Sequence, residues 1–281
     1  DPSAEANEMD IPDELLDTIE GAFWPPDVDL FRTLLAATAT HLPGDLAELG
    51  VFYGKSAVLL GASLGDGEVL TVVDLFEAGA PDEENQGEND ASYAGLTRAA
   101  FEANYRRVHS ALPVVVQGLS ESIVDHARHG THRFVHVDAS HLHAHVVADI
   151  DAARLLLAPD GILVLDDFRE EHTPGVAAAA WQAVLTSGLR PFAVSPHKMY
   201  ATWGDGSRWQ AAVEEWATGT TWVLERQVVN GDSLVRIGSP VSGTLPPDHP
   251  ARRFVPPVVW PLVRRMGERA GLRTGGTRDQ R

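Results

Sequence analysis

Apolar positions along the chain follow two different periods. Residues 13–23 (DELLDTIEGAF) and 27–42 (DVDLFRTLLAATATHL) repeat apolar residues every three to four positions, which predicts two amphipathic helices, the second with Asp27 as its N-cap. Short apolar runs rich in β-branched residues then alternate with helix-length segments, at 46–52, 68–76, 113–118, 133–139 and 161–168. Strands of this kind are buried on both faces, so the pattern predicts an α/β fold with a doubly wound, mostly parallel sheet.

The pattern changes after the fifth run. Runs 191–196 and 197–203 lie too close together for a helical crossover, so we expect them to pair antiparallel at one edge of a seven-stranded sheet. A helix over 207–217 and a hairpin that turns at Asn230-Gly231 follow. The expected divisions are an N-terminal helical extension (1–43), a core (44–204) and a C-terminal extension of helix, hairpin, short helix and frayed basic tail (205–281).

The composition of the chain argues against thiolate chemistry, nucleic-acid partners and membrane-spanning segments. The 281 residues are 44% hydrophobic and include no cysteine, which excludes thiolate catalysis and leaves only oxygen or imidazole to hold a metal. With 22 Lys+Arg against 40 Asp+Glu, the formal charge of -18 disfavours nucleic acid as a partner. No apolar run approaches the roughly 20 residues that span a bilayer, and the acidic N-terminus lacks the features of a signal peptide. We therefore expect a soluble cytoplasmic protein with no membrane partner.

A glycine-containing turn follows the first core strand. The stretch AELGVFYGKSAVLL places Glu48, Gly50, Gly54 and Ser56 where that strand meets the next helix, so the backbone there can approach a ligand closely. Asp74 lies 24 residues after Gly50, at the end of the second strand, where a carboxylate can accept hydrogen bonds from ribose hydroxyls. A structural turn or a helix cap would explain either feature alone, but together they favour a nucleoside-containing cofactor.

The spacing of this turn also bears on the charge of the cofactor. It reads G-x-x-x-G rather than the dinucleotide pattern, and Glu48 precedes Gly50 by two residues, which suits a cationic group better than a pyrophosphate. The stretch ELGVFYGKS resembles the first motif of class I S-adenosylmethionine-dependent methyltransferases, with Asp74 as the ribose-binding acid. The resemblance implies a Rossmann-like methyltransferase fold, and its cofactor-binding candidates are Glu48, Gly50, Tyr53, Gly54, Ser56, Asp74, Gln117, Gly118, Ser120 and Asp138.

Three aspartates follow the ends of two predicted strands. Asp138 ends the fourth strand, and Asp166 and Asp167 end the fifth. If these strands are neighbours about 4.8 Å apart, three carboxylates meet at the ligand-binding edge of the sheet, where a divalent cation would relieve their repulsion. Oxygen ligands favour Mg²⁺, or Mn²⁺, over zinc. Alternatively, Asp166 or Asp167 caps the next helix while Asp138 binds a backbone amide or Arg169.

Four histidines surround Asp138 in the stretch RFVHVDASHLHAHVVADI. His141, three residues after Asp138, can lean over the same sheet edge, and we expect it to be a general base. His141 and His145 form an i,i+4 pair of the kind that can hold zinc, but the glutamate of H-E-x-x-H is absent. We assign His136, His143 and His145 to packing or to solvent.

A second resemblance covers residues 44–204. The stretches DASH, LLLAPDGILVLDDF and TPGVAAA are similar to metal-dependent sugar O-methyltransferases of the macrocin and mycinamicin type. In that family the counterparts of Asp138, Asp166 and Asp167 hold magnesium, and the counterpart of His141 is the proposed base. The resemblance implies transfer of a methyl group from S-adenosylmethionine to a sugar or glycoside hydroxyl, with the metal on two vicinal oxygens. A macrolide sugar, a mannose-type polysaccharide precursor and another vicinal diol all fit as acceptors, in natural-product or polysaccharide biosynthesis.

Several alternatives stay open. An NAD-dependent oxidoreductase, a metal-dependent hydrolase and a noncatalytic cofactor-binding subunit each use part of the same pattern. The acidic segment 77–92 (EAGAPDEENQGENDAS) is expected to be a long loop beside the site, either a lid or a solvated loop. The N-terminal helices and the C-terminal hairpin are candidate surfaces for a homo-oligomer.

Overall fold

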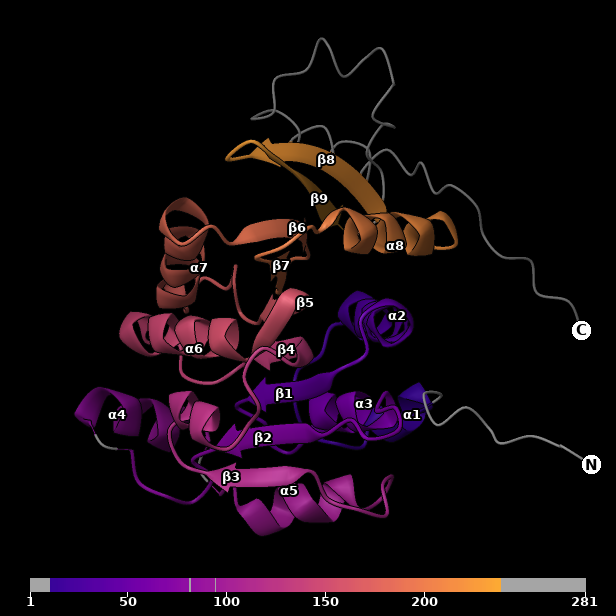
Figure 1. Cartoon of the computed structure of the whole chain (residues 1–281). Helices are drawn as coiled ribbons and strands as arrows, with labels where there is room; N and C mark the ends of the chain where they lie inside the picture. The colour runs from indigo at the N-terminus through magenta and orange to yellow at the C-terminus, as the bar shows by residue number, and fades with distance from the viewer. Residues whose placement is uncertain (1–10, 81, 94, 239–281) are drawn as a thin grey trace, which may run out of the picture. The chain divides into compact units, whose positions relative to one another are not determined.

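Nine strands form one sheet in the computed structural model, which describes residues 11–80, 82–93 and 95–238. Their order across the sheet is β3-β2-β1-β4-β5-β7-β6-β9-β8 (Figure 1). The strands are β1 (Asp45–Leu49), β2 (Leu70–Asp74), β3 (Val114–Gln117), β4 (His132–Val137), β5 (Leu157–Leu165), β6 (Arg190–Val194), β7 (Met199–Thr202), β8 (Val223–Val229) and β9 (Asp232–Gly238). The predicted α/β fold with a mostly parallel sheet is confirmed.

The strand pairing confirms most of the expected topology and corrects one part. β1 to β5 pair with one another in parallel, and β7 pairs antiparallel with both β5 and β6. The expectation of seven strands is wrong, because β9 pairs in parallel with β6 and β8 pairs antiparallel with β9. The predicted hairpin turn is present: Asn230 (φ 51°) and Gly231 (φ 88°) both have positive φ, as a tight two-residue turn requires. This hairpin therefore extends the sheet beyond β6.

Eight α-helices and one 3₁₀ helix accompany the strands in the described residues. They are α1 (Asp13–Leu16), α2 (Pro25–His41), α3 (Lys55–Ala62), α4 (Glu83–Ser92), α5 (Arg98–Tyr105), η1 (Ser120–Asp125), α6 (His143–Leu156), α7 (Pro174–Thr186) and α8 (Ser207–Thr218). Within this part of the chain, no helix is long and apolar enough to cross a membrane.

The two N-terminal helices differ from their predicted limits. α1 is a single turn, and the chain leaves it through Gly21, whose φ of 135° no helix allows. α2 begins at Pro25, because proline is well suited to the first turn of a helix. Asp27 is therefore not the N-cap. It lies within the first turn, fully buried, and its carboxylate accepts hydrogen bonds from Ser195 Oγ (2.9 Å) and Tyr200 OH (2.6 Å).

The acidic segment 77–92 is not a continuous loop, since α4 occupies most of it. Asp82 caps this helix by accepting a hydrogen bond from the Asn85 amide (2.8 Å). Glu83 and Glu84 lie in the first turn, where negative charge is favourable. The helix has almost no apolar side chains, so hydrophobic periodicity could not reveal it.

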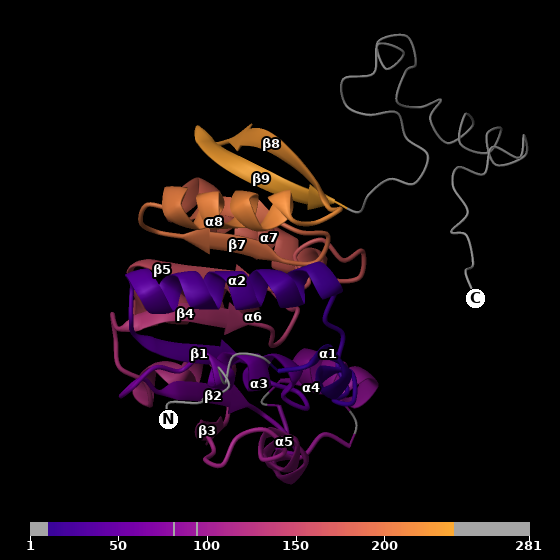
Figure 2. The same cartoon turned by 90° about the vertical axis from the view of Figure 1, so that its right-hand side faces the viewer.

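The helices cover the two faces of the sheet in separate groups. α1, α2, α3, α5 and α8 pack on one face, and α6, α7 and η1 pack on the other (Figure 1). Figure 2 shows α2 in front of the sheet beside β4 and β5, running along these strands. There the Phe31 ring contacts the rings of Phe134, His136 and Tyr200, with centroids 5.1, 5.0 and 6.4 Å away. Glu48, on β1, is the register partner of His136 and faces the same way. A polar pair thus lies beneath an apolar helix.

Candidate active site

Two of the predicted aspartates follow neighbouring strands. β4 and β5 pair in parallel with Val137 opposite Leu165, so Asp138 and Asp166 lie side by side just beyond the strand ends. The Asp166 amide donates to the Val137 carbonyl (2.9 Å), and the Asp138 amide donates to the Leu49 carbonyl (2.7 Å). The expected adjacency of these strands is confirmed.

The glycine turn after β1 is held against the end of β2. Asp74 Oδ2 accepts hydrogen bonds from the amides of Val51 (2.8 Å) and Phe52 (3.0 Å), and Oδ1 accepts one from the Phe76 amide (2.7 Å). Burial raises the pKa of Asp74, and these amides offset only part of the rise. Gly50 has φ 78°, and a Cβ there would lie 2.1 Å from the Asp138 carbonyl oxygen, so only glycine fits. Asp74 therefore shapes the turn in addition to facing the cavity beside it.

A first cavity lies along the ends of β1, β2 and β3. Five of the predicted cofactor-binding residues line it: Gly50, Asp74, Gly118, Ser120 and Asp138. The other five do not: Ser56 lines a second cavity, and Glu48, Tyr53, Gly54 and Gln117 line neither of these two. The predicted turn and ribose position thus face one cavity, while their contacts with a cofactor stay a prediction.

Helix α4 forms one wall of this first cavity. Asn85 and Asn89 line the cavity from α4, and Tyr93 lines it just after the helix. In Figure 1, α4 lies on the side toward which the arrowheads of β1, β2 and β3 point. His145 also lines it, with Nε2 3.4 Å from Asp82 Oδ2, although the sequence assigned this histidine to packing or solvent. The segment expected to be a lid or a solvated loop therefore contributes directly to the wall.

A second cavity, of about 470 Å³, adjoins the first. The two share Phe52, Tyr93 and Asp138 in their linings. Phe23 and Trp24, between α1 and α2, supply aromatic surface to the second cavity, and the Trp24 ring lies 5.5 Å from that of His197. Asp138 thus stands where the two cavities meet.

An acidic cluster lines the second cavity. His136 Nε2 and one carboxylate oxygen each of Asp138 and Asp166 lie within 4.8 Å of one another. Asp167 is directed elsewhere: its backbone has φ 51°, and its Oδ2 lies 2.8 Å from His141 Nε2. Desolvation and the Asp166 carboxylate raise the pKa of Asp138 well above its usual value. Of the three predicted metal ligands, two lie together with His136, while Asp167 pairs with His141.

Lys198 enters this cluster from the turn before β7. Its ammonium forms an ion pair with the Asp166 carboxylate and lies 3.3 Å from His136 Nε2, and its side chain is 2% exposed. Burial disfavours the charged lysine, but Asp166, Asp138 and Asp27 outweigh it and raise the pKa of Lys198. Lys198 is not among the site residues predicted from the sequence, because a single lysine before a strand has no distinguishing pattern.

A buried chain of hydrogen bonds continues from Lys198 to Glu48. Burial and then the Lys198 charge lower the pKa of His136 to about 3, so its imidazole is neutral. Its Nε2 then accepts from Lys198, and its Nδ1 donates to Glu48 Oε1 (2.7 Å). Ser56 Oγ donates to the same oxygen, and burial raises the pKa of Glu48 to about 8. The packing role assigned to His136 is incomplete, because this histidine joins the acidic cluster to the turn after β1.

Both ring nitrogens of His141 face carboxylates. Nδ1 lies 2.6 Å from Glu88 Oε1, on α4, and Nε2 lies 2.8 Å from Asp167 Oδ2. Burial alone would lower the pKa of His141, but the hydrogen bonds with Asp167 and Glu88 outweigh it and raise the pKa to about 10. Glu88 also accepts from Ser140 Oγ (2.7 Å) and the His141 amide (2.9 Å). Near neutral pH this imidazole is protonated, so it must lose a proton before it can serve as the base predicted from the sequence.

A family model and solved structures that resemble this chain are those of methyltransferases. Residues 47–168 match the family model described as "Methyltransferase domain". The solved structure of the O-methyltransferase NovP is 17% identical, with a TM-score of 0.52 over 64% of this chain and 80% of that one. The structure of CalS11, a TDP-rhamnose 3'-O-methyltransferase of calicheamicin biosynthesis, is 18% identical, with a TM-score of 0.43 over 69% of this chain and 80% of that one. No curated protein matches the sequence. The predicted resemblance to class I methyltransferases is thereby confirmed.

Proposed function

We propose that this chain is a class I methyltransferase and that it transfers a methyl group from S-adenosylmethionine to a hydroxyl group of a sugar or glycoside. The observation that carries the proposal is the position of Asp138, which lines both cavities. A cofactor in the first cavity and an acceptor in the second would meet at this residue. A noncatalytic cofactor-binding subunit does not need a second cavity that meets the first, and a hydrolase does not need a nucleoside cavity. An NAD-dependent oxidoreductase is disfavoured instead by the G-x-x-x-G spacing of the turn after β1, which lacks the dinucleotide pattern.

The first cavity has the groups that a sulfonium nucleoside needs. Asp74 faces the expected ribose position, and Gly118 and Ser120 lie where the adenine is expected. Gly50 brings the backbone close to the methionine part, while Asp138 places a carboxyl group toward the sulfonium. We assign the cofactor to this cavity.

The second cavity suits a polar ring. Phe23 and Trp24 offer faces on which a sugar ring can stack, and the carboxylates of Asp166 and Asp167 can accept hydrogen bonds from its hydroxyls. This combination of aromatic surface with acceptor oxygens supports a glycoside rather than a purely apolar acceptor. The NovP fold hosts O-methylation, which agrees with a hydroxyl as the methylated group.

Transfer requires a base as well as close approach. The acceptor oxygen attacks the methyl carbon, the carbon–sulfur bond breaks with its electron pair passing to sulfur, and the hydroxyl proton goes to a side chain. His141 is the base expected from the sequence, but Glu88 and Asp167 already hold its two nitrogens. Asp138 is a second candidate because it lies between the cavities. Its raised pKa makes the carboxylate a stronger base once it is ionised, although it too must first release a proton.

A divalent cation at the acidic cluster was expected from the sequence. One imidazole nitrogen and two carboxylate oxygens form a donor set that Mn²⁺ or Mg²⁺ accepts. The Lys198 ammonium, however, already contacts Asp166 and lies 3.3 Å from His136 Nε2, so a second cation would have to share its position. The residues as placed therefore do not fit a bound metal ion. Magnesium dependence stays a prediction from the sequence.

Calorimetric titration with S-adenosylhomocysteine tests the cofactor assignment. We expect the wild-type chain to bind one equivalent, and Asp74→Asn to weaken binding about tenfold, because the carboxylate that shapes the turn becomes an amide. Asp205→Asn, at an exposed residue outside the lining of both cavities, is the matched control and should bind like the wild type. Failure of the wild-type chain to bind the nucleoside would reject the proposed function.

A further inference from the structure

We propose that the Lys198 ammonium is the resident cation of the acidic cluster and takes the place of a divalent metal there. Its role toward an acceptor rests on the function proposed above, whereas its occupancy of the cation position does not. The consequence is a methyl-transfer site that works without added metal.

The position of Lys198 is the first argument. His136 Nε2 and Asp166 Oδ2 are 3.8 Å apart. A metal ion bonded to both, at about 2.1 Å from each, would have to lie near the midpoint between them. The Lys198 Nζ atom already contacts that oxygen and lies 3.3 Å from that nitrogen, so the metal ion would overlap the ammonium. The two cations therefore exclude each other.

The backbone around Lys198 holds it in this place. Met199 is the register partner of Leu165 across the β5–β7 pair, which brings Lys198 next to Asp166. The turn before β7 is closed by hydrogen bonds from the Lys198 amide to Ser195 Oγ (2.8 Å) and from the Ser195 amide to the Lys198 carbonyl (2.9 Å). The register of β7 on β5 and the turn before β7 therefore fix the position of the Lys198 backbone.

Two aromatic rings complete the enclosure. The ammonium lies 4.9 Å from the centre of the Phe23 ring and 5.7 Å from that of Phe31, at distances that favour a cation. With 2% of its side chain exposed, Lys198 is enclosed by protein groups on most sides. These surroundings suit a covalently attached ammonium better than an exchangeable metal ion.

The same ammonium can assist methyl transfer. It has three N–H donors, of which Asp166 and His136 use two. Lys198 lines the second cavity, so the third can donate to the acceptor oxygen and stabilise the negative charge that develops as the hydroxyl proton leaves. Lys198 keeps its own protons throughout, and the hydroxyl proton goes to the base.

Binding of Mn²⁺ alone tests the inference. The chelator-treated full chain is titrated with Mn²⁺, and the free ion is followed by electron paramagnetic resonance. We expect wild type and Lys55→Met to bind no Mn²⁺ at this cluster, since Lys55 lines the same cavity but lies outside the cluster. Lys198→Met and Lys198→Gln should each gain one site that binds at least about tenfold more tightly than any site in the wild type, because a unit charge has been removed from it.

The double variant Lys198→Met, Asp166→Asn should lose the site that Lys198→Met gains. Thermal melting establishes that each variant is folded, and Lys198→Gln keeps a donor toward Asp166 if the methionine variant does not fold. Stoichiometric Mn²⁺ binding by the wild type that Asp166→Asn removes would overturn the inference. A folded Lys198→Gln variant that binds no Mn²⁺ would overturn it as well, because the cluster would then not be a cation site. Neither readout involves S-adenosylmethionine, so failure of the proposed function would be recognised separately.

Discussion

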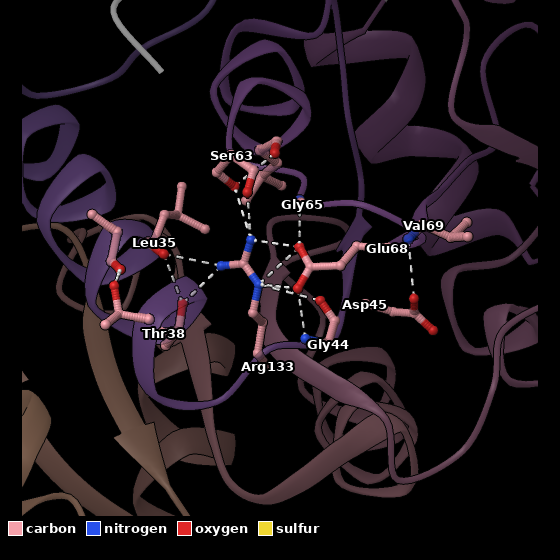
Figure 3. Close-up of polar contacts among 12 residues, drawn as sticks. Leu35, Thr38, Gly44, Asp45, Ser63, Gly65, Glu68, Val69 and Arg133 are labelled. Carbon is pink, nitrogen blue, oxygen red and sulfur yellow. Dashed lines mark hydrogen bonds and ion pairs between the residues drawn. The ribbon is translucent and has the colours of Figure 1, made fainter. Parts of the chain in front are cut away.

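The two ends of strand β4 each carry a buried cluster of charges, and the clusters differ in how completely they are paired. At the amino end, Arg133 is fully buried, and every nitrogen of its guanidinium has a partner (Figure 3). Its partners are Glu68, Thr38 and the carbonyls of Leu35, Gly44 and Ser63.

The carboxyl end of β4 is paired less completely. The Lys198 ammonium forms an ion pair with Asp166 and also feels the charge of Asp138, and the Glu48 Oε2 atom is buried without a hydrogen-bond partner. Buried charges whose partners are all present serve the fold. Buried acidic groups that lack partners and lie beside a cavity indicate instead a site for a ligand. The following predictions test this contrast from the largest expected effect to the smallest.

The amino-end cluster should matter for folding. Arg133→Met leaves Glu68 and several buried carbonyls without their donor, so we expect the free energy of unfolding to fall by about 3–5 kcal/mol in urea denaturation. Arg226→Gln breaks an ion pair whose arginine is 70% exposed and should cost less than about 1 kcal/mol. Equal losses in the two variants would remove the basis of the comparison.

The carboxyl-end cluster should matter for chemistry. Asp138→Asn removes a candidate base, and we expect the initial rate of methyl transfer to fall about 10²-fold or more. Because the pKa of Asp138 is raised in the folded chain, the wild type loses stability as pH rises from the unfolded value toward the folded one. The variant should therefore be at least as stable as the wild type at pH 8, in urea denaturation. A large loss of stability together with an unchanged rate would assign Asp138 to the fold instead.

Glu48 offers a test through pH. Burial raises its pKa in the folded chain to about 8, above the usual 4.5 of a glutamate, so the folded chain keeps a proton that the unfolded chain releases. The wild type should then lose roughly 2–4 kcal/mol relative to Glu48→Gln as pH rises from about 4.5 to 8. Urea denaturation at several pH values measures the difference, and parallel pH profiles would contradict the assignment of a protonated Glu48.

The contact between α4 and His141 should give the smallest effect. The raised pKa of His141 stabilises the fold fully below pH 6.5, and this contribution is lost as pH rises through about 10. Glu88→Gln should lower the pKa of His141, observed by NMR, and cost about 1 kcal/mol at pH 6 but little at pH 10. Glu84→Gln, exposed on the same helix, is the control. An unchanged histidine titration would show that Asp167 alone sets this pKa.

The sequence predicted the sheet edge at which the site lies, because the positions of Asp74, Asp138 and Asp166 follow directly from apolar runs that end in acids. It did not predict that His136 joins Asp138 and Asp166 in the acidic cluster. His136 lies two residues after Phe134 on β4 and therefore on the same face of the sheet, so its neighbourhood with Glu48 could have been inferred once β1 and β4 were paired.

Lys198 and α4 lay beyond sequence reasoning for different reasons. Lys198 meets Asp166 only through the register of β7 on β5, which no local pattern encodes. Helix α4 has too few apolar residues to show a period, and its contact with His141 is a single carboxylate. The predicted short helix and tail at 255–281 lie outside the described residues.

The most direct test of the account is transfer of an isotope-labelled methyl group from S-adenosylmethionine to a panel of sugars and glycosides, with wild type and Asp138→Asn assayed side by side. The account predicts label on a hydroxyl oxygen of at least one glycoside with the wild-type chain, and a loss of about 10²-fold or more in the variant. Label transfer at the same rate in both, or no transfer by a wild-type chain that binds the cofactor, would contradict the claim that the two cavities meet at Asp138 for methyl transfer to a sugar.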